Sequence, residues 1–311
     1  ELDNLGVRVA NLEKKADNVK ITGNIRYNYA DYDEDGYATK LRSRIWVKGQ
    51  INDDWTYTGM LQNVQNLKNN AGDEKTDFQR AYVDGKIGGL AVQAGRSQLT
   101  LVDGNLYDTR ADGIVASYGK DVKVTGFYAK PTDQVKALNS TVELEYDNVY
   151  GAKVDAKFGV VAATAGYTVF KDGTFTDGAF SEKWDDNKIW NVGVAFDLAK
   201  DLNLTANYMD SDQEIYGDDD AFVIGLSYAG AKAAKEGSFG VYGKYYDQAR
   251  STVVAHTMNG AYGNHGFKGY MVGANYTFAK NIVGAVEYYD LEDKWNHSDI
   301  NTLWSQVVFT F

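Results

Sequence analysis

The sequence predicts an all-β protein, a transmembrane antiparallel β-barrel of about 16 strands with a short N-terminal helical (coiled-coil) stub. Three observations predict it. From Val19 to Phe311 apolar and polar residues alternate with the period of two that is typical of strands. The connections switch between tight turns and long polar loops, which is the pattern of outer-membrane barrels. No run approaches the roughly 18 to 20 apolar residues of a transmembrane helix.

The composition favours one unusual domain. The 311 residues include 32 Gly, 23 Tyr and 6 Trp, but only 1 Pro and no Cys. The mean hydropathy is low, at -0.44, as expected when half of each strand lines a polar lumen. A net charge of -11 argues against nucleic acid as a partner. The chain starts at Glu1 without a Met or a signal peptide, so we expect a mature or truncated form.

Residues 1–18 predict a helix that ends a coiled-coil stalk. Leu2, Leu5, Val9 and Leu12 are alternately three and four residues apart, which is the spacing of an a/d seam. A helix this short is marginal by itself. We therefore favour an oligomeric stalk over an amphipathic helix that packs on its own domain.

Residues 19–311 are expected to form the barrel. The predicted strands are 19–29, 41–51, 55–67, 77–87, 90–96, 112–118, 122–130, 149–158, 160–170, 188–198, 202–210, 220–230, 237–247, 269–278, 282–290 and 300–311. Tight turns are expected at 52–54, 88–89, 119–121, 159, 199–201 and 279–281, and long loops at 30–38, 68–76, 131–147, 171–187, 248–268 and 291–299.

Aromatic residues gather near the ends of the apolar strand faces. Amphipathic rings favour the level of the lipid headgroups, so these positions predict two girdles. The members are Tyr27, Tyr29, Trp55, Tyr57, Tyr118, Tyr128, Tyr167, Trp190, Phe196, Tyr208, Tyr228, Tyr276 and Phe278.

Several segments resemble known families. FQRAYVDGKIGG-LAVQAGR, followed by a long insert and IVASYG, resembles the Gram-negative general porins. The last strand, with Phe309 and Phe311 on one face, resembles the signal by which outer-membrane barrels are recognised for insertion. VANLEKKADNVKITGNIRYNY is similar to the OmpM-type porins of diderm Firmicutes. That resemblance implies a homotrimer, with a peptidoglycan-binding SLH domain and a trimeric coiled coil before the barrel. The SLH domain is absent here, so peptidoglycan would be reached only through a missing N-terminal domain.

The insert Ser97–Ala111 is expected to fold into the lumen as a constriction loop. Six of the eight arginines lie between residues 26 and 110, and the alternation of the strands places most of them on the lumen face. The candidate basic wall is Arg26, Arg42, Arg44, Lys48, Arg80 and Arg96, of which Arg96 requires an irregularity near Gly95. The insert contributes Asp103, Tyr107, Asp108 and Arg110. This arrangement, a basic wall that faces an acidic loop, resembles that of the general porins. The alternative is that the arginines only solvate the lumen and pair with local carboxylates.

No metal or cofactor site is predicted. Asp31-x-Asp33-x-Asp35-Gly36 copies half of an EF-hand loop, but Arg42 stands where the bidentate Glu is required. Asp218-Asp219-Asp220 and Asp185-Asp186 are read as acidic loops. A loose Ca²⁺ or Mg²⁺ site at these loops is the alternative.

The sequence also argues against an enzyme. His256, His265 and His297 fall in expected loops without zinc-ligand spacing, and no GxSxG nucleophile motif occurs. Glu143 and Glu145 share one strand face at a spacing that glycosidases use. We interpret them instead as lining of the lumen.

The prediction is a general diffusion porin in outer-membrane lipid, which passes small hydrophilic solutes and ions without catalysis. Two alternatives remain. One is a tether between the outer membrane and peptidoglycan with an incidental pore. The other is a substrate-specific, sugar-type channel in which Trp46, Tyr82, Tyr242 and Tyr246 line a sliding path.

Overall fold

The protein is described by a computed structural model over residues 18–33, 36–69, 71–132 and 142–311. The predicted stalk residues Leu2, Leu5, Val9 and Leu12 lie outside the described residues. Among the described residues, no helix combines the length and apolar character needed to span a bilayer.

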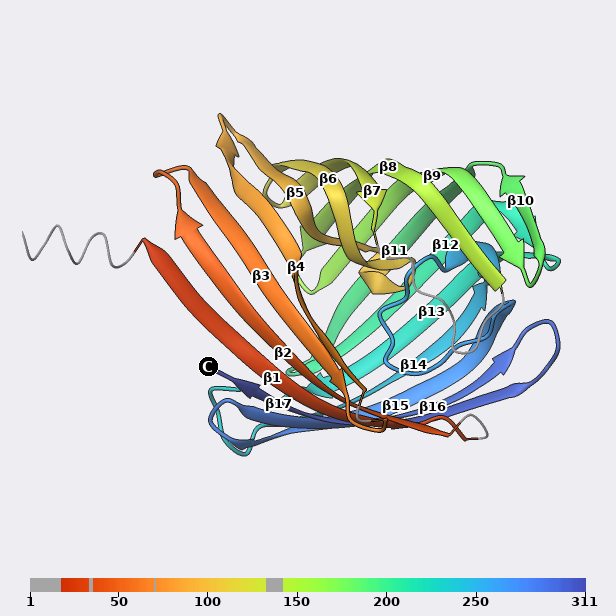
Figure 1. The fold of residues 1–311 in the computed structure, drawn as a ribbon. Helices are drawn as coiled ribbons and strands as arrows, with labels where there is room; N and C mark the ends of the chain where they lie inside the picture. The colour runs from red at the N-terminus through yellow and green to blue at the C-terminus, as the bar shows by residue number, and fades with distance from the viewer. Residues whose placement is uncertain (1–17, 34–35, 70, 133–141) are drawn as a thin grey trace, which may run out of the picture.

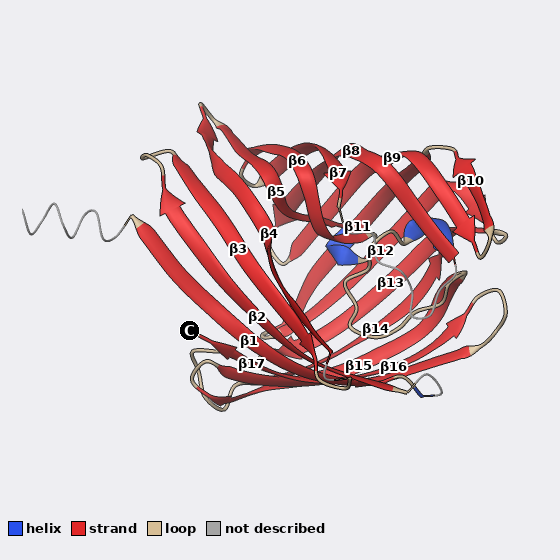
Figure 2. Ribbon diagram, viewed as in Figure 1, coloured by secondary structure: helices blue, strands red, loops and turns tan. Residues whose placement is uncertain are grey.

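The described residues form one antiparallel sheet that closes on itself as a barrel (Figure 1). Its strands are β1 (Val19–Asp31), β2 (Tyr37–Gln50), β3 (Trp55–Asn66), β4 (Ala71–Ile87), β5 (Leu90–Leu101), β6 (Tyr107–Gly119), β7 (Val122–Pro131), β8 (Val142–Phe158), β9 (Val161–Asp177), β10 (Phe180–Trp184), β11 (Asn187–Ala199), β12 (Leu202–Ile215), β13 (Asp218–Ala229), β14 (Phe239–Ala249), β15 (Gly266–Ala279), β16 (Ile282–Asp293) and β17 (Asp299–Thr310). Two short 3₁₀ turns, η2 (Val102–Gly104) and η3 (Arg250–Thr252), are shown as helix in Figure 2.

Sixteen of these strands make the wall, and the prediction of an all-β, 16-stranded antiparallel barrel is confirmed. The extra strand is β10, which is short and pairs with the end of β9, from Phe180 opposite Asp177 to Trp184 opposite Gly173. The wall closes where β1 pairs with β17, from Asn24 opposite Thr310 to Asp31 opposite Leu303. Phe311 completes the seam, because its backbone exchanges two hydrogen bonds with Gly23, at 2.7 and 2.9 Å.

The tight turns at one end follow from local chemistry. The Asn52 side-chain oxygen accepts hydrogen bonds from the N–H groups of Asp54 (3.0 Å) and Trp55 (2.9 Å), which closes the β2–β3 turn. Asp201 and Asn281 adopt positive φ in the β11–β12 and β15–β16 turns, as these two residue types tolerate. This end of the barrel is called the turn end below, and the opposite end the loop end.

The strands at the loop end are longer than predicted. β8 begins at Val142 and β9 runs to Asp177, so much of the expected loops 131–147 and 171–187 is strand. Alternation already fails where the β9 extension begins, since Val169 and Phe170, at the end of the predicted strand, are both buried. The period of two therefore marked only the part of each strand that has an apolar outer face.

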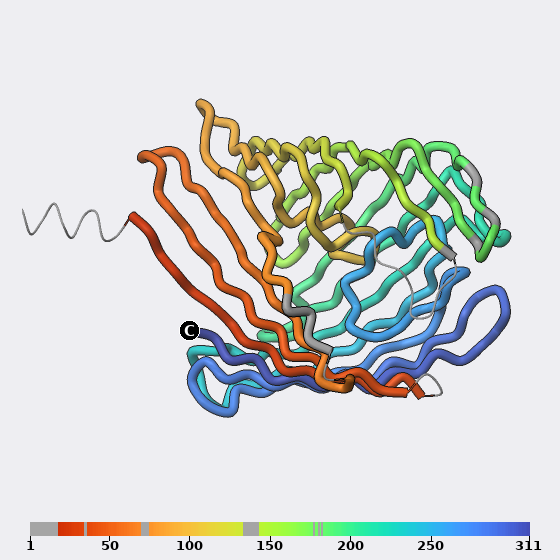
Figure 3. The backbone as a smooth tube through the Cα atoms, viewed as in Figure 1, coloured from red at the N-terminus to blue at the C-terminus, as the bar shows by residue number. Residues whose placement is uncertain are grey.

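The outer surface of the wall carries exposed apolar side chains on most of its strands. The aromatic members of the predicted girdles that are well exposed are Tyr27, Tyr118, Tyr128, Tyr167, Trp190, Tyr228, Tyr276 and Phe278. The buried clusters lie on the other side of the wall, where two segments from the loop end fill part of the lumen (Figure 3). One is the β5–β6 hairpin and the other is the connection between β14 and β15.

Candidate functional site in the barrel lumen

The β5–β6 hairpin leaves the wall at a pair of glycines. Gly95 and Gly113 face each other, and Gly95 has φ +119°. A Cβ on Gly95 would lie 2.5 Å from the Ala81 carbonyl oxygen, so only glycine fits this bend. Pairing between β4 and β5 ends one residue later, at Arg96. The irregularity that the sequence required near Gly95 is therefore present, and beyond it the hairpin has lost one neighbour of the wall.

Alternation gives the hairpin an apolar face and a polar face. Leu99 and Leu101 are buried with Tyr107 and Ala111 in one cluster, together with Phe127 and other residues from β7 to β13. Gln98 is paired with Arg110, and Thr100 with Asp108, on the other face. Burial of apolar side chains thus holds one face of the hairpin against the β7–β12 side of the barrel. The polar face points into the lumen.

The tip of the hairpin reaches the far wall. The Asp103 carboxylate accepts a hydrogen bond from the side-chain amide of Asn207 on β12, at 3.0 Å. Val102, Asp103 and Gly104 all have positive φ, a conformation that is unusual for a β-branched residue. A Cβ on Gly104 would lie 2.7 Å from the Thr257 side chain, which explains the glycine at the crowded end of the turn.

A second inward segment, which the sequence analysis did not identify, runs from Arg250 to His265 between β14 and β15. Val254 and Ala255 donate backbone hydrogen bonds to the Leu106 carbonyl (3.0 and 3.1 Å). Asp108 donates in return to the Ala255 carbonyl at 2.7 Å, and Tyr107 forms a parallel bridge with Ala255. The hairpin is therefore held by this segment as well as by the wall (Figure 3).

Two buried basic side chains anchor the second segment. Arg250 donates to the Val253 carbonyl and is almost completely buried. The His256 ring lies 3.0 Å from the Gln248 side-chain oxygen through Nε2, and its Nδ1 accepts from the Met258 N–H at 3.0 Å. Burial, with a smaller contribution from Lys244, lowers the pKa of His256 to about 3. His256 is therefore neutral at physiological pH, and its ring holds the segment through the contacts with Gln248 and Met258.

The predicted basic wall is assembled by the register of the first four strands. Arg26 is opposite Arg42, Asn24 is opposite Arg44, and Met60 is opposite Arg80. Arg26 stacks over the Trp304 ring at 5.4 Å, and Arg44 Nε donates to Gln62 at 2.7 Å. Within the described part of the chain, neither Arg26, Arg42 nor Arg44 forms an ion pair. For these three arginines, the described residues therefore do not support the alternative that the basic side chains pair with local carboxylates.

The hairpin meets this wall at Arg80. The Arg80 guanidinium donates to the Gln98 side-chain oxygen, and the Gln98 amide donates to Asp108 at 2.8 Å. Thr100 also donates to Asp108, at 2.8 Å. Arg80 and Asp108 are thus joined through Gln98.

The other predicted site residues are dispersed. Arg96 is bound by both carboxylate oxygens of Asp112, at 2.6 and 2.7 Å. Lys48 is opposite Lys20 and Thr58, further toward the turn end. Tyr107 is fully buried and donates to the Arg110 carbonyl, so its ring belongs to the apolar face. Asp103 turns toward β12 rather than toward the arginines.

The wall itself supplies an acid, Glu287, that was not among the predicted site residues. Glu287 on β16 is 8% exposed and accepts hydrogen bonds from the Tyr242 hydroxyl (2.8 Å), the Tyr289 hydroxyl and the Asn259 amide (2.9 Å). β16 is separated from β1 by β17 alone, so this fixed carboxylate neighbours the arginine strands. The alternation of β16 carried the signal, because Val286 and Tyr288 on either side are exposed.

Two other lumen assignments change. Tyr246 is inward but only 1% exposed, because Tyr262 and Phe267 cover it, so it does not line an open path. The interpretation of Glu143 and Glu145 as luminal is wrong: Leu144 and Tyr146 between and beside them are the buried residues of β8. The loss of clean alternation above the apolar band explains the error.

The structure brings one acidic cluster together among the described residues, and it lies at the start of β13 rather than in a loop as expected. Carboxylate oxygens of Asp218, Asp219 and Asp220 lie within 4.8 Å of one another. The Lys294 ammonium ion-pairs with Asp218 and Asp247, so a protein cation already balances part of this charge. Asp35 of the EF-hand-like stretch lies outside the described residues.

Comparison with known proteins identifies the fold. No family model and no curated protein sequence matches the chain. OmpF from Salmonella typhi, solved with daunomycin, aligns over 94% of this chain and 97% of its own, with a TM-score of 0.63 at 15% identity. A loop-deletion variant of OmpT, an outer-membrane protein of Vibrio cholerae, gives 0.60 at 16% over 94% and 99%. A variant of the Rhodobacter blastica porin gives 0.59 at 15% over 94% and 100%. The barrel therefore has the general-porin fold.

Proposed function

We propose that the protein is an outer-membrane diffusion porin whose water-filled lumen is narrowed by the hairpin Ser97–Ala111. It passes small hydrophilic solutes and ions and performs no chemistry on them. The observation that carries this proposal is the two-faced hairpin: its apolar face is buried against one side of the barrel and its polar face bears Gln98 and Asp108, which connect to Arg80. A closed wall with an exposed apolar outer surface supports a place in lipid.

The selectivity is expected to come from a transverse field. Arg26, Arg42 and Arg44 lie on β1 and β2 without ion pairs within the described residues, whereas Asp108 and Glu287 are held by hydrogen bonds. Charges that line a narrow aqueous gap between low-dielectric walls interact more strongly than in bulk water. Such a field orients dipolar solutes and disfavours long apolar ones.

The assembly is expected to be a homotrimer, and Phe309 and Phe311 are expected to serve in recognition for insertion. Phe309 and Phe311 are both exposed on the last strand, which leaves them accessible to a recognition factor. The alternative of a sugar-type channel has less support, because Tyr246 is covered. Attachment to peptidoglycan would require a segment outside the described residues.

Planar-bilayer recording and vesicle swelling test the proposal. The wild-type protein should give stable conductance steps and solute flux that rises linearly with concentration. The double variant Arg42→Ala/Arg44→Ala should shift the reversal potential in a KCl gradient toward cation preference, because two unpaired cations leave the narrow region. Lys188→Ala, which removes an exposed cation paired with Asp212 on the outer surface, is the matched control.

The absence of conductance steps would refute the proposal outright. Saturable, solute-specific flux would favour the specific channel. An unchanged reversal potential in the arginine variant, with normal conductance, would refute the field while leaving the porin.

A further inference from the structure

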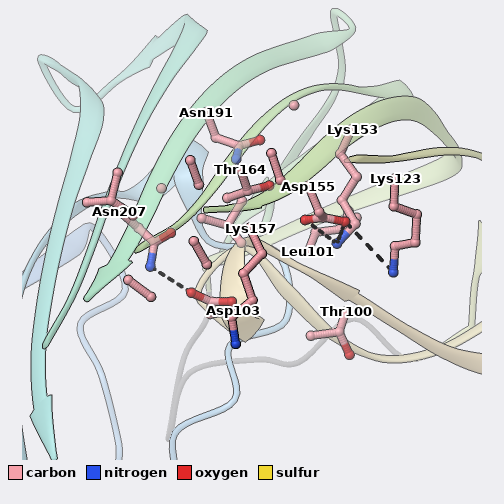
Figure 4. Close-up of a pocket in the computed structure, with 18 of the residues that line it drawn as sticks. Thr100, Leu101, Asp103, Lys123, Lys153, Asp155, Lys157, Thr164, Asn191 and Asn207 are labelled. Carbon is pink, nitrogen blue, oxygen red and sulfur yellow. Dashed lines mark hydrogen bonds and ion pairs between the residues drawn. The ribbon is translucent and has the colours of Figure 1, made fainter. Parts of the chain in front are cut away.

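A cavity of about 430 Å³ lies on the turn-end side of the hairpin tip. Thr100, Leu101 and Asp103 of the hairpin form one boundary, and the inner faces of β7, β8, β9, β11 and β12 form the rest (Figure 4). Lys120 and Asp121, from the β6–β7 turn, line its outlet. Its lining includes none of the basic-wall residues Arg26, Arg42, Arg44 and Arg80.

Two glycines hollow out the floor of this cavity and fix two amides. A Cβ on Gly166 would lie 2.7 Å from Asn191 Oδ1, and one on Gly193 would lie 2.4 Å from Asn207 Oδ1. Both amide oxygens are therefore directed at the wall, which directs the N–H₂ groups away from it. The Asn207 amide donates to Asp103, and the Asn191 nitrogen is turned toward Thr164 in the cavity (Figure 4).

Beyond the outlet residues Lys120 and Asp121, Lys123, Lys153 and Lys157 line the same cavity, and the first two share the Asp155 carboxylate. Lys153 lies 3.2 Å from Asp155 Oδ2, and Lys123 lies 4.0 Å from the same oxygen. Lys157 has no side-chain partner among the residues that the structure describes. Asp103, the acid across the cavity, is already bound to Asn207. The local balance therefore favours positive charge and hydrogen-bond donors, in a protein whose net charge is -11.

We propose that this cavity is a binding site for small anions that carry a phosphate or carboxylate group. The inference rests on the proposed function, because such a solute reaches the site through the lumen. Lys153, Lys123 and Lys157 supply the ammonium groups, and Asn191 supplies an amide donor. Ammonium and amide hydrogen bonds to an anionic oxygen are stronger than those between neutral groups. The site holds anions briefly after they pass the hairpin, or concentrates them before they enter from the turn end.

Current block by inorganic phosphate tests the proposal on the full-length protein in planar bilayers at fixed KCl. Phosphate added at the turn end should reduce the wild-type current saturably, and addition at the loop end should do so less effectively because the hairpin intervenes. Lys153→Gln should raise the half-blocking concentration about three- to fivefold, as expected for one partly exposed charge pair. Asp155→Asn should lower it, since two ammonium groups lose their competing carboxylate.

The control is Lys86→Gln, which removes the same charge from the turn end of β4, outside the lining of this cavity. Malonate replaces phosphate in a second arm and distinguishes carboxylate from phosphate recognition, and glycerol is the neutral arm. Saturable block by phosphate or malonate, altered in opposite directions by the Lys153 and Asp155 variants, supports the site. Channels that conduct normally without saturable block, or block that Lys86→Gln changes as much as Lys153→Gln, overturn it. The absence of any channel would refute the porin function itself, and this outcome is distinct from normal channels that lack the anion site.

Discussion

The two segments that enter the lumen are held in different ways. The β5–β6 hairpin keeps the strand ladder as it leaves the wall, with Ser97–Leu101 still paired to Tyr107–Ala111. Among the described residues, the segment Arg250–His265 forms only two isolated bridges, Tyr107 to Ala255 and Asn264 to Gly266, and it depends on side chains such as Arg250 and His256. The hairpin is thus stiff by itself, and the second segment is a brace whose position depends on individual contacts.

The difference separates two roles in the lumen. In the porin function that we propose, the hairpin sets the width of the passage, because its ladder fixes the position of its polar face. The second segment sets whether the hairpin tip stays in place, because Leu106 and Asp108 are its backbone partners. Asn259 from the same segment also binds Glu287, so the brace and the wall acid are connected.

Breaking the brace should give the largest effect. Ala255→Pro removes one of the two N–H groups that donate to the Leu106 carbonyl, which costs about 0.5 to 1.5 kcal/mol, and the Pro ring also restricts the backbone of Val254 before it. The single-channel conductance and its noise should rise, with the barrel itself intact. The control is Ala234→Pro in the exposed β13–β14 connection. Equal behaviour of the two variants in bilayer recordings would show that the second segment does not hold the hairpin.

Neutralising the wall acid should have an intermediate effect. In Glu287→Gln the amide N–H₂ faces a Tyr hydroxyl or the Asn259 amide, so one donor loses its acceptor and the lumen loses a negative charge. The reversal potential should shift toward anions, and the free energy of unfolding should fall by about 1.5 to 3 kcal/mol, the range for hydrogen bonds to a charged group. Glu145→Gln removes an equal charge from an exposed position on β8. A similar shift in reversal potential for both variants would contradict a special place for Glu287.

The same contrast decides how much the sequence could predict. The wall was predictable because one apolar face in contact with lipid imposes a period of two, and the bend near Gly95 could be inferred from the parity of Arg96. Once the hairpin leaves the wall, parity no longer says which face meets which partner, so Tyr107 was assigned to the pore although it is buried. The second segment has no period at all. Its only signal was the apolar run Val253-Val254-Ala255 in a polar loop, and these three residues are at most 2% exposed.

The smallest expected effect concerns pH and the brace. His256 is buried with Nε2 at Gln248 and Nδ1 accepting the Met258 N–H, so the neutral ring satisfies both nitrogens. Its pKa of about 3 lies below the value near 6.5 of an unfolded chain. Between these values the unfolded state binds the extra proton, so stability falls as pH is lowered, by at most about 1.4 kcal/mol per pH unit from this one group.

His256→Gln should flatten the dependence of the thermal unfolding midpoint on pH between about 6.5 and 3, relative to His297→Gln at the exposed β16–β17 loop. Equal slopes in the two variants would mean that His256 is not held neutral in the folded barrel. A flatter slope in His256→Gln, with conductance at pH 7 unchanged, would place the proton sensitivity in the brace and not in the hairpin, whose described contacts involve no histidine side chain.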